Sequence, residues 1–202
     1  MTIANKPLSS LNVQGFDKKF ENILQTKEWN KLQSDFNSCN RILIVGNGGN
    51  LAVADHASID IARLTNKSAA APGSGILASS LINDISHDDW VQKWVDISLR
   101  GQFPENLSKT MLIGISSAGN SKNICLALDY ALSKGLKAGL ICASSPKIEG
   151  NYNVVSLFLN EYHTGEVLTL LLFYQLIHGS GFICPSIDKA TENPNERIDY
   201  SA

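Results

Sequence analysis

The chain has 202 residues, 44% of them hydrophobic and 18% charged, a balance typical of one globular domain with a sizeable core. Its formal net charge of −2 gives no electrostatic reason to expect nucleic acid or an acidic membrane as a partner. The longest apolar run, 167–177, is too short to span a bilayer, and residues 1–16 lack the basic start and apolar core of a signal peptide. We therefore expect a cytoplasmic protein.

The cysteines contain no CxxC pair, and three of them lie in or beside apolar segments. They are Cys39, Cys125, Cys142 and Cys184. This pattern favours buried free thiols in a reducing compartment over disulfides or a metal cluster.

Apolar periodicity predicts the first elements in chain order. The segment 17–36 repeats at a mostly helical spacing and predicts one helix. A continuous apolar strand at 41–46 and a helix at about 50–64 follow. The polar segment 65–74, which contains Pro and Gly, is interpreted as a connection. The short run 76–82 is compatible with a strand or a helix, and periodicity does not decide between them.

The rest of the chain continues the alternation of helices and strands. The expected elements are a helix at 89–100, a strand at 110–115, a helix at 120–133, strands at 137–142 and 154–159, and a long helix at 164–178. This order predicts an α/β fold with a doubly wound parallel sheet and helices on both faces. Residues 1–186 form a single domain in this interpretation, and 187–202 form a polar, mobile tail.

Two Gly- and Ser-rich turns each join a buried strand to a helix. The first contains Asn47, Gly48, Gly49 and Asn50, and the second contains Ser116, Ser117, Asn120 and Ser121. A helix N-terminus offers unpaired N–H groups and a positive dipole end, both of which suit a phosphate. The pair of turns predicts a phosphorylated small molecule bound at the carboxyl ends of parallel strands.

Other interpretations of these turns are weaker. The first turn fails the dinucleotide fingerprint because Leu51 stands where the third glycine is needed, and no Walker lysine follows either turn. A glycine turn after a strand can also be only a tight turn, but the second turn, with three hydroxyls, favours binding.

His56 and Asp60 lie four residues apart on the predicted helix after the first turn, so they share one face. A carboxylate there could move a proton, and both groups could bind a metal. Spacing alone favours a solvated pair on a helix surface. Their place beside the predicted phosphate site narrows this preference.

Further polar residues have two interpretations each. The loop after Asn83 and Asp84, which carries His87 and two aspartates, could form the edge of a site, or Asp88 or Asp89 could cap the next helix. At the start of the last helix, His163 and Glu166 could serve a site or only complement a helix dipole.

Taken together, these residues resemble the sugar isomerase (SIS) domain family, and within it the phosphoheptose isomerases, over about residues 15–180. The segments IVGNGGN (44–50) and GISSAGNSKN (114–123) are similar to the first glycine turn and the phosphate loop of the family. The stretch from Val53 to Asp60 is similar to its A-x-x-H-x-x-x-E helix, and Asn83-Asp84 matches an N-D pair.

The resemblance implies a flavodoxin-like parallel sheet and a homotetramer with active sites between subunits. It also implies an aldose–ketose isomerase that interconverts sedoheptulose 7-phosphate and D-glycero-D-manno-heptose 7-phosphate through an enediol. A divalent metal such as zinc would assist. Asp60 and His56 would be the catalytic residues and metal ligands, with His163 as a further possible ligand. The substrate would contact both turns and Asp84.

The chain departs from the family pattern in three places. The first glycine turn ends in Asn50, where the family usually has serine. Asp60 is one methylene shorter than the family's glutamate. On the last helix, alignment through Glu166 puts Gly165 and Phe173 at the family's glutamine and final histidine, and a shift of two residues puts His163 and Leu171 there. The missing histidine favours an alternative function, a non-catalytic phosphosugar-binding protein that acts as a sensor or partner subunit.

Overall fold

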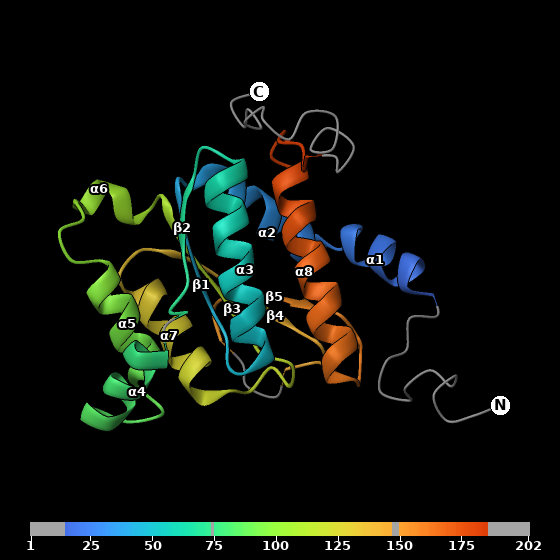
Figure 1. Ribbon diagram of the computed structural model, residues 1–202. Helices are drawn as coiled ribbons and strands as arrows, with labels where there is room; N and C mark the ends of the chain where they lie inside the picture. Colours follow the sequence, from blue (N-terminus) through green and yellow to red (C-terminus); the bar gives the residue numbers. More distant parts are fainter. Residues whose placement is uncertain (1–14, 74, 147–149, 186–202) are drawn as a thin grey trace, which may run out of the picture.

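The computed structural model describes residues 15–73, 75–146 and 150–185 as a three-layer α/β structure (Figure 1). Its strands are all parallel and lie in the order β2-β1-β3-β4-β5. The strands are β1 Arg41–Val45, β2 Ser68–Ala70, β3 Thr110–Ile115, β4 Lys137–Cys142 and β5 Asn153–Ser156. The helices are α1 Phe16–Leu24, α2 Lys27–Ser38, α3 Gly49–Leu64, α4 Gly75–Asp84, α5 Trp90–Ser98, α6 Pro104–Leu107, α7 Lys122–Ser133 and α8 Tyr162–His178. The predicted α/β doubly wound fold is confirmed.

The strand order reverses between β1 and β3. Arg41 pairs with Thr110 at one end of these strands, and Val45 pairs with Gly114 at the other. The turns that follow β1 and β3 therefore leave the sheet side by side. In an open parallel sheet, such a reversal is the usual place for a ligand.

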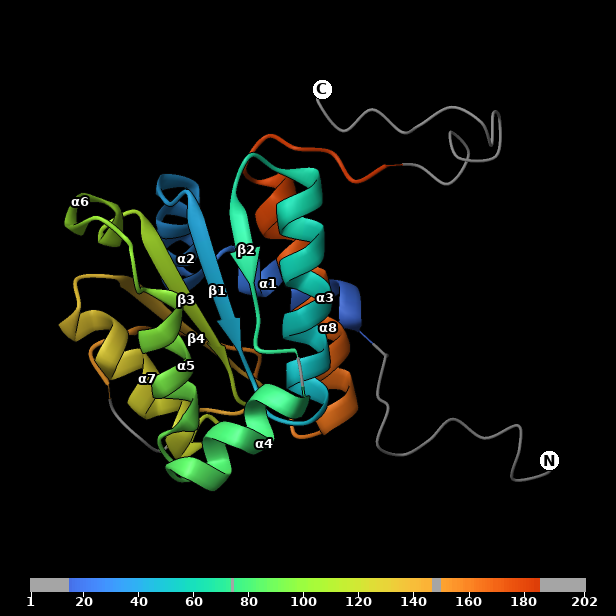
Figure 2. The ribbon, with the colours of Figure 1, turned by 60° about the vertical axis from the view of Figure 1, so that its left-hand side comes forward.

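Two apolar clusters hold the helices on the sheet. One cluster joins α2, α3 and α8 to one face and includes Leu32, Ile44 and Leu172. The other joins α5 and α7 to the opposite face and includes Leu43 and Trp94. Figure 2 shows the two helical layers on either side of the sheet. Because β1, β3 and β4 are covered on both faces, their sequences are continuous apolar runs.

Three predicted elements differ from the structure, and one undecided run is settled by it. The helix predicted at 17–36 is two helices: α1 ends at Leu24, and the Thr26 hydroxyl accepts a hydrogen bond from the Trp29 amide at 3.1 Å as the N-cap of α2. The predicted connection 65–74 contains β2, and the undecided run 76–82 lies within helix α4. The predicted strand 154–159 ends at Ser156.

Within the described residues, no helix is long and apolar enough to cross a membrane. All four cysteines are free, and three of them are buried. The predicted tail 187–202 lies outside the described residues.

Candidate active site

The two predicted phosphate turns lie side by side and are joined by side-chain hydrogen bonds. Asn47 and Asn123 bond through both their amide groups, at 2.9 and 3.0 Å. Asn50 donates to the Ser117 hydroxyl at 3.0 Å. These bonds cross from the turn after β1 to the turn after β3, so the two turns form one pre-organised unit.

The serines of the second turn differ in burial and therefore in the role that they can have. Ser116 is only 1% exposed, and its hydroxyl lies 2.8 Å from that of Ser121. It also accepts a hydrogen bond from the Ser121 amide at 3.3 Å. The buried Ser116 hydroxyl therefore stabilises the shape of the loop through its hydrogen bonds with Ser121. Ser117 and Ser121 are half-buried and Asn120 is exposed, so these three side chains remain accessible to a ligand.

The helices that begin at the two turns have no side-chain caps. Gly48, the N-cap of α3, has no side chain that could cap the helix. Ser121 is the N-cap of α7, and its side chain makes no capping hydrogen bond. Gly48 has φ of 55° and Gly119 has φ of 67°, a backbone region that favours glycine. The uncapped N–H groups and the positive ends of both helix dipoles suit an anion.

A small cavity of about 140 Å³ opens beside the second turn. Ser117 and Ala118 line one wall, and Glu161 and Tyr162 at the start of α8 line another. Small-molecule sites usually enclose roughly 300–1,000 Å³. The cavity is therefore smaller than the usual enclosure of a small-molecule site.

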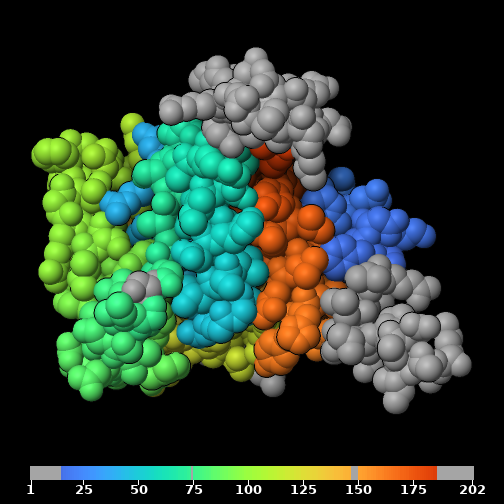
Figure 3. All heavy atoms as spheres, viewed as in Figure 1, coloured from blue at the N-terminus to red at the C-terminus, as the bar shows by residue number. Residues whose placement is uncertain are grey.

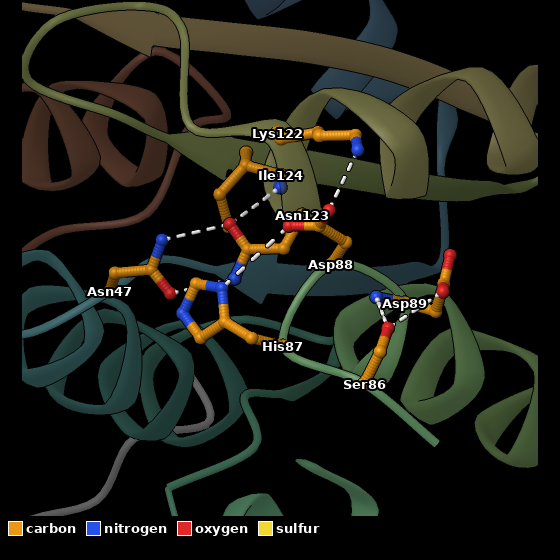
Figure 4. Close-up of polar contacts among 8 residues, drawn as sticks. All are labelled: Asn47, Ser86, His87, Asp88, Asp89, Lys122, Asn123 and Ile124. Carbon is orange, nitrogen blue, oxygen red and sulfur yellow. Dashed lines mark hydrogen bonds and ion pairs between the residues drawn. The ribbon is translucent and has the colours of Figure 1, made fainter.

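The loop between α4 and α5 is held beside the amino end of α7, where the second turn leads into this helix (Figure 4). Lys122 pairs with Asp88 at 2.7 Å, and this hydrogen bond lowers the pKa of the Asp88 carboxyl and raises that of Lys122. Asp89 is the N-cap residue of α5, as the capping interpretation predicted, but its side chain makes no capping hydrogen bond. Its carboxylate instead accepts from the Ser86 hydroxyl at 2.7 Å, and that hydroxyl accepts from the Asp89 amide at 3.0 Å.

Asp84 is exposed at the end of α4, where it accepts a hydrogen bond from Asn83 at 3.0 Å. Helix α4 lies at the same end of the sheet as the two turns (Figures 1 and 2). His87 is also exposed and lies 3.9 Å from Asp88. The Asn83–His87 segment thus brings polar groups to this end of the molecule without burying them.

His56 and Asp60 form a second polar cluster, higher on α3. Asp60 is only 8% exposed, and its carboxylate contacts His56 at 3.1 Å and Arg63 at 2.8 Å. From α8, the Tyr174 hydroxyl donates to Asp60 at 3.1 Å and lies 2.8 Å from His56 Nε2. Burial, together with the hydrogen bond to Asp60, raises the pKa of the Tyr174 phenol.

Glu166 lies at the opposite, amino end of α3. A Cβ atom on Gly49 would collide with the Glu166 carboxylate, which places this anion against the first turn of α3. His163 lies 3.5 Å from Glu166. Glu166 therefore complements the dipole of α3 rather than that of its own helix, and α7 is left as the more open helix end for a phosphate.

The metal-binding hypothesis receives limited support from one subunit. His56 and Asp60 are two adjacent donors, but Arg63 already holds one carboxylate oxygen. In the part of the chain that the structure describes, no three His, Cys, Asp or Glu side chains gather as a metal site would require. His163 contacts Glu166 and does not complete such a group. The described residues of one chain thus do not form a complete metal site by themselves.

Comparison with known proteins identifies relatives of one kind. No protein-family model matches the chain. It is 30% identical over 145 residues to a phosphoheptose isomerase of Aneurinibacillus thermoaerophilus, which covers 69% of this chain and 72% of that protein. The chain belongs to the phosphoheptose isomerase family. The members of this family are isomerases, so the family predicted from the sequence motifs is confirmed.

Other relatives match over shorter regions. A phosphoheptose isomerase of Chlorobium phaeobacteroides is 31% identical over 110 residues, and one of Pelodictyon phaeoclathratiforme is 27% identical over 110 residues. Each match covers 50% of this chain. The chain spans only 46% and 49% of the length of these two relatives.

Solved structures confirm the SIS fold. The phosphoheptose isomerase of Neisseria gonorrhoeae superposes with a TM-score of 0.66 at 20% identity, over 82% of this chain and 90% of that one. The enzyme from Francisella tularensis gives 0.62 at 15% identity, over 83% and 97%.

Two residues of the Asp60 cluster were not predicted from the sequence. Arg63, three residues after Asp60, had a visible signal, because this spacing places the two on one helix face. Tyr174 had none. It lies on a helix that is apolar on all sides, and its contact with Asp60 spans 114 positions of the chain.

Proposed function

We propose that this chain is a phosphosugar aldose–ketose isomerase, and specifically that it interconverts sedoheptulose 7-phosphate and D-glycero-D-manno-heptose 7-phosphate. The observation that carries the proposal is the joined pair of turns at the strand-order reversal. The amino end of α7, together with the accessible Ser117, Asn120 and Ser121, suits a sugar phosphate. Family membership supplies the reaction class.

The proposed chemistry moves one proton between neighbouring carbons. A base removes a proton from C1 of the ketose, an enediol forms as O2 gains a proton, and the carbon proton returns to C2 while O1 loses its hydroxyl proton and becomes the aldehyde oxygen. Asp60 is our candidate base. Removing a proton beside a carbonyl also requires stabilisation of the oxygen that becomes charged. His56 and Tyr174, each within 3.1 Å of Asp60, are the candidate donors for this oxygen.

The two halves of this site are separated within one chain. Asp60 lies eleven positions after Gly49 on α3, which corresponds to about 16 Å along the helix axis. An extended seven-carbon chain measures only roughly 8 Å from C1 to C7. A sugar phosphate held by one chain's turns would not easily span this distance to that chain's Asp60. We therefore propose that the active site combines the turns of one subunit with the Asp60 cluster of another.

The surface of the α3–α8 layer supports such an assembly. Ile59 on α3 is 60% exposed, and Val167 and Leu171 on α8 are 50% and 40% exposed. Figure 3 shows α3 and α8 side by side on one face of the molecule. A helix that is apolar on all sides is normally buried on all sides. We propose a homo-oligomer, a tetramer by analogy with the family resemblance, which covers this face.

A divalent metal, with zinc as the first choice, remains part of the proposal only if another subunit completes its ligands. His56 would be the donor from this chain. No step above depends on it. The free, buried Cys39, Cys125 and Cys142 support a reducing compartment, and we propose the cytoplasm.

The test is turnover of sedoheptulose 7-phosphate in heavy water, with and without added zinc. NMR would detect deuterium at C1 of the ketose and formation of the aldose. Asp60→Asn keeps the size of the side chain but removes its basicity, and we expect a loss of ~10²–10⁴-fold in rate. Asp55→Asn, on the same helix and outside the cluster, is the matched control.

Two results would contradict the proposal. Unchanged turnover in Asp60→Asn would move the proton chemistry to another group. No turnover by the native chain under either condition, with sugar phosphate still bound, would leave a binding protein and not an isomerase.

A further inference from the structure

A polar cavity of about 390 Å³ lies at the opposite end of the sheet from the two turns. It is formed by the amino ends of β1, β2 and β3 and by the segment around α6. Figure 2 shows α6 beside the end of the sheet where β1 and β3 begin. Strand β1 from Arg41 to Val45 separates this cavity from the first turn by about 13 Å. The cavity is therefore distinct from the proposed active site.

Local sequence explains why the cavity exists. Strand β2 contributes Ser68, Ala69 and Ala70, whose small side chains leave space next to β1. On the face that carries Leu43, helix α5 ends at Ser98, and the four-residue α6 covers little of the sheet beyond it. The amino end of β1 is therefore open to solvent on this face.

The cavity holds positive charge without a compensating acid. Arg41 is half-buried, and burial is the only cause that lowers the pKa of its guanidinium. Lys109 lies on the rim, and among the described residues neither cation forms an ion pair. No Asp or Glu lines the cavity. A partly buried charge normally has a partner because desolvation is costly.

Neutral hydrogen-bonding groups surround the two cations. Asn40, Gln102 and Asn106, which carry amide side chains, are among the lining residues. An arginine fork, a lysine point charge and amides together match a phosphate attached to a hydroxyl-bearing group. The volume of about 390 Å³ is larger than inorganic phosphate needs and lies within the range of small-molecule sites.

We propose that this cavity, at the amino ends of β1, β2 and β3, is a second anion site that binds a small phosphorylated metabolite. Arg41 binds the phosphate, Lys109 adds charge at the rim, and the amides contact the remainder of the ligand. Because the site lies at the far end of β1, its occupancy does not depend on the active-site turns or on isomerase activity.

Amide NMR with inorganic phosphate tests this site, with chloride at equal ionic strength as the reference. We expect saturable shifts at the amides of Ser68, Ala69 and Thr110, in addition to any shifts at the turn after β3. Arg41→Gln should weaken the response in the cavity by about tenfold or more, because it removes a charge-assisted pair. The response at the turn should remain.

Lys109→Gln changes an exposed side chain and therefore tests the site without risk to the fold; it should weaken phosphate binding in the cavity severalfold. Lys31→Gln, on α2 and away from the cavity, is the matched control and should change nothing. The proposal is overturned if the native chain shows no saturable shift at the cavity, or if both Arg41→Gln and Lys109→Gln retain native affinity there. Loss of phosphate binding at the turn alone would contradict the proposed active site and not this one.

Discussion

The Tyr174 hydroxyl offers a direct test of the Asp60 cluster. Tyr174→Phe removes only the oxygen that donates to Asp60 at 3.1 Å and lies 2.8 Å from His56. Hydrogen bonds to charged groups contribute roughly 1.5–3 kcal/mol. Because Tyr174 and His56 are partly open to solvent, we expect the lower end, a loss of about 1.5 kcal/mol in the free energy of unfolding. For a chain of this size, that is a decrease of about 3–6 °C in melting temperature.

A double-mutant cycle separates this hydrogen bond from general effects of each substitution. Tyr174→Phe and Asp60→Ala should together cost about 1 kcal/mol less than the sum of the single variants, since each removes the hydrogen bond between the phenol and the carboxylate. Denaturant unfolding at one fixed subunit concentration provides the measurement. Tyr162→Phe, on the same helix with a residue exposure of 65%, should leave stability within about 0.5 kcal/mol of native.

The pH dependence gives a second signature. The pKa of Tyr174 is raised above its ordinary 10.0, so its contribution is complete below that pH and is lost as pH rises through the raised value. The difference between the native chain and Tyr174→Phe should therefore be constant near neutral pH and become smaller above pH 10. The inferred contact would be refuted if the losses in the free energy of unfolding of the two single variants simply add in the double variant. It would also be refuted if Tyr174→Phe is as stable as the native chain.

Three further predictions concern other parts of the site. Gly119→Ala should destabilise the chain more than Gly101→Ala and abolish phosphate binding at the turn. Both have positive φ and share a strain of roughly 1–2 kcal/mol, but only at Gly119 would a Cβ lie 2.8 Å from backbone. Lys122→Met should raise the pKa of Asp88 toward 3.8 in a carboxyl NMR titration. Phe173→His should cost about 3 kcal/mol or more in denaturant unfolding, because the ring is 1% exposed.

The sequence predicted the elements whose signals are local. Strands β3 and β4 were predicted at their observed bounds, since strands covered on both faces are continuous apolar runs. Strand β2 was missed because Ser68–Ala70 has no apolar run and is a strand only through its pairing with β1. The break between α1 and α2 was missed because apolar periodicity continues through Thr26, although its capping position was visible in the sequence.

For the candidate site too, the sequence indicated some features and not others. The turns after β1 and β3 follow from glycine and serine positions, and the parallel register of the strands brings them together. Which hydroxyls face a ligand could not be predicted, because the burial of Ser116 and the exposure of Asn120 depend on packing. The contact of Tyr174 with Asp60 depends on how α8 is rotated against α3. Because apolar residues occur all around α8, its sequence pattern does not show which side of the helix faces α3.

Two of the departures from the family pattern lie together in space. In the alignment through Glu166, the shortened carboxylate of Asp60 and the position of the missing histidine, Phe173, both lie at the contact between α3 and α8. Phe173 is buried in the core, and the next residue, Tyr174, places its hydroxyl between Asp60 and His56. A polar group from α8 thus still reaches the carboxylate, from a neighbouring position and with different chemistry. The turns and the Asp60 cluster lie far apart along α3, so we expect phosphate binding at the turns to survive loss of the Asp60 carboxylate.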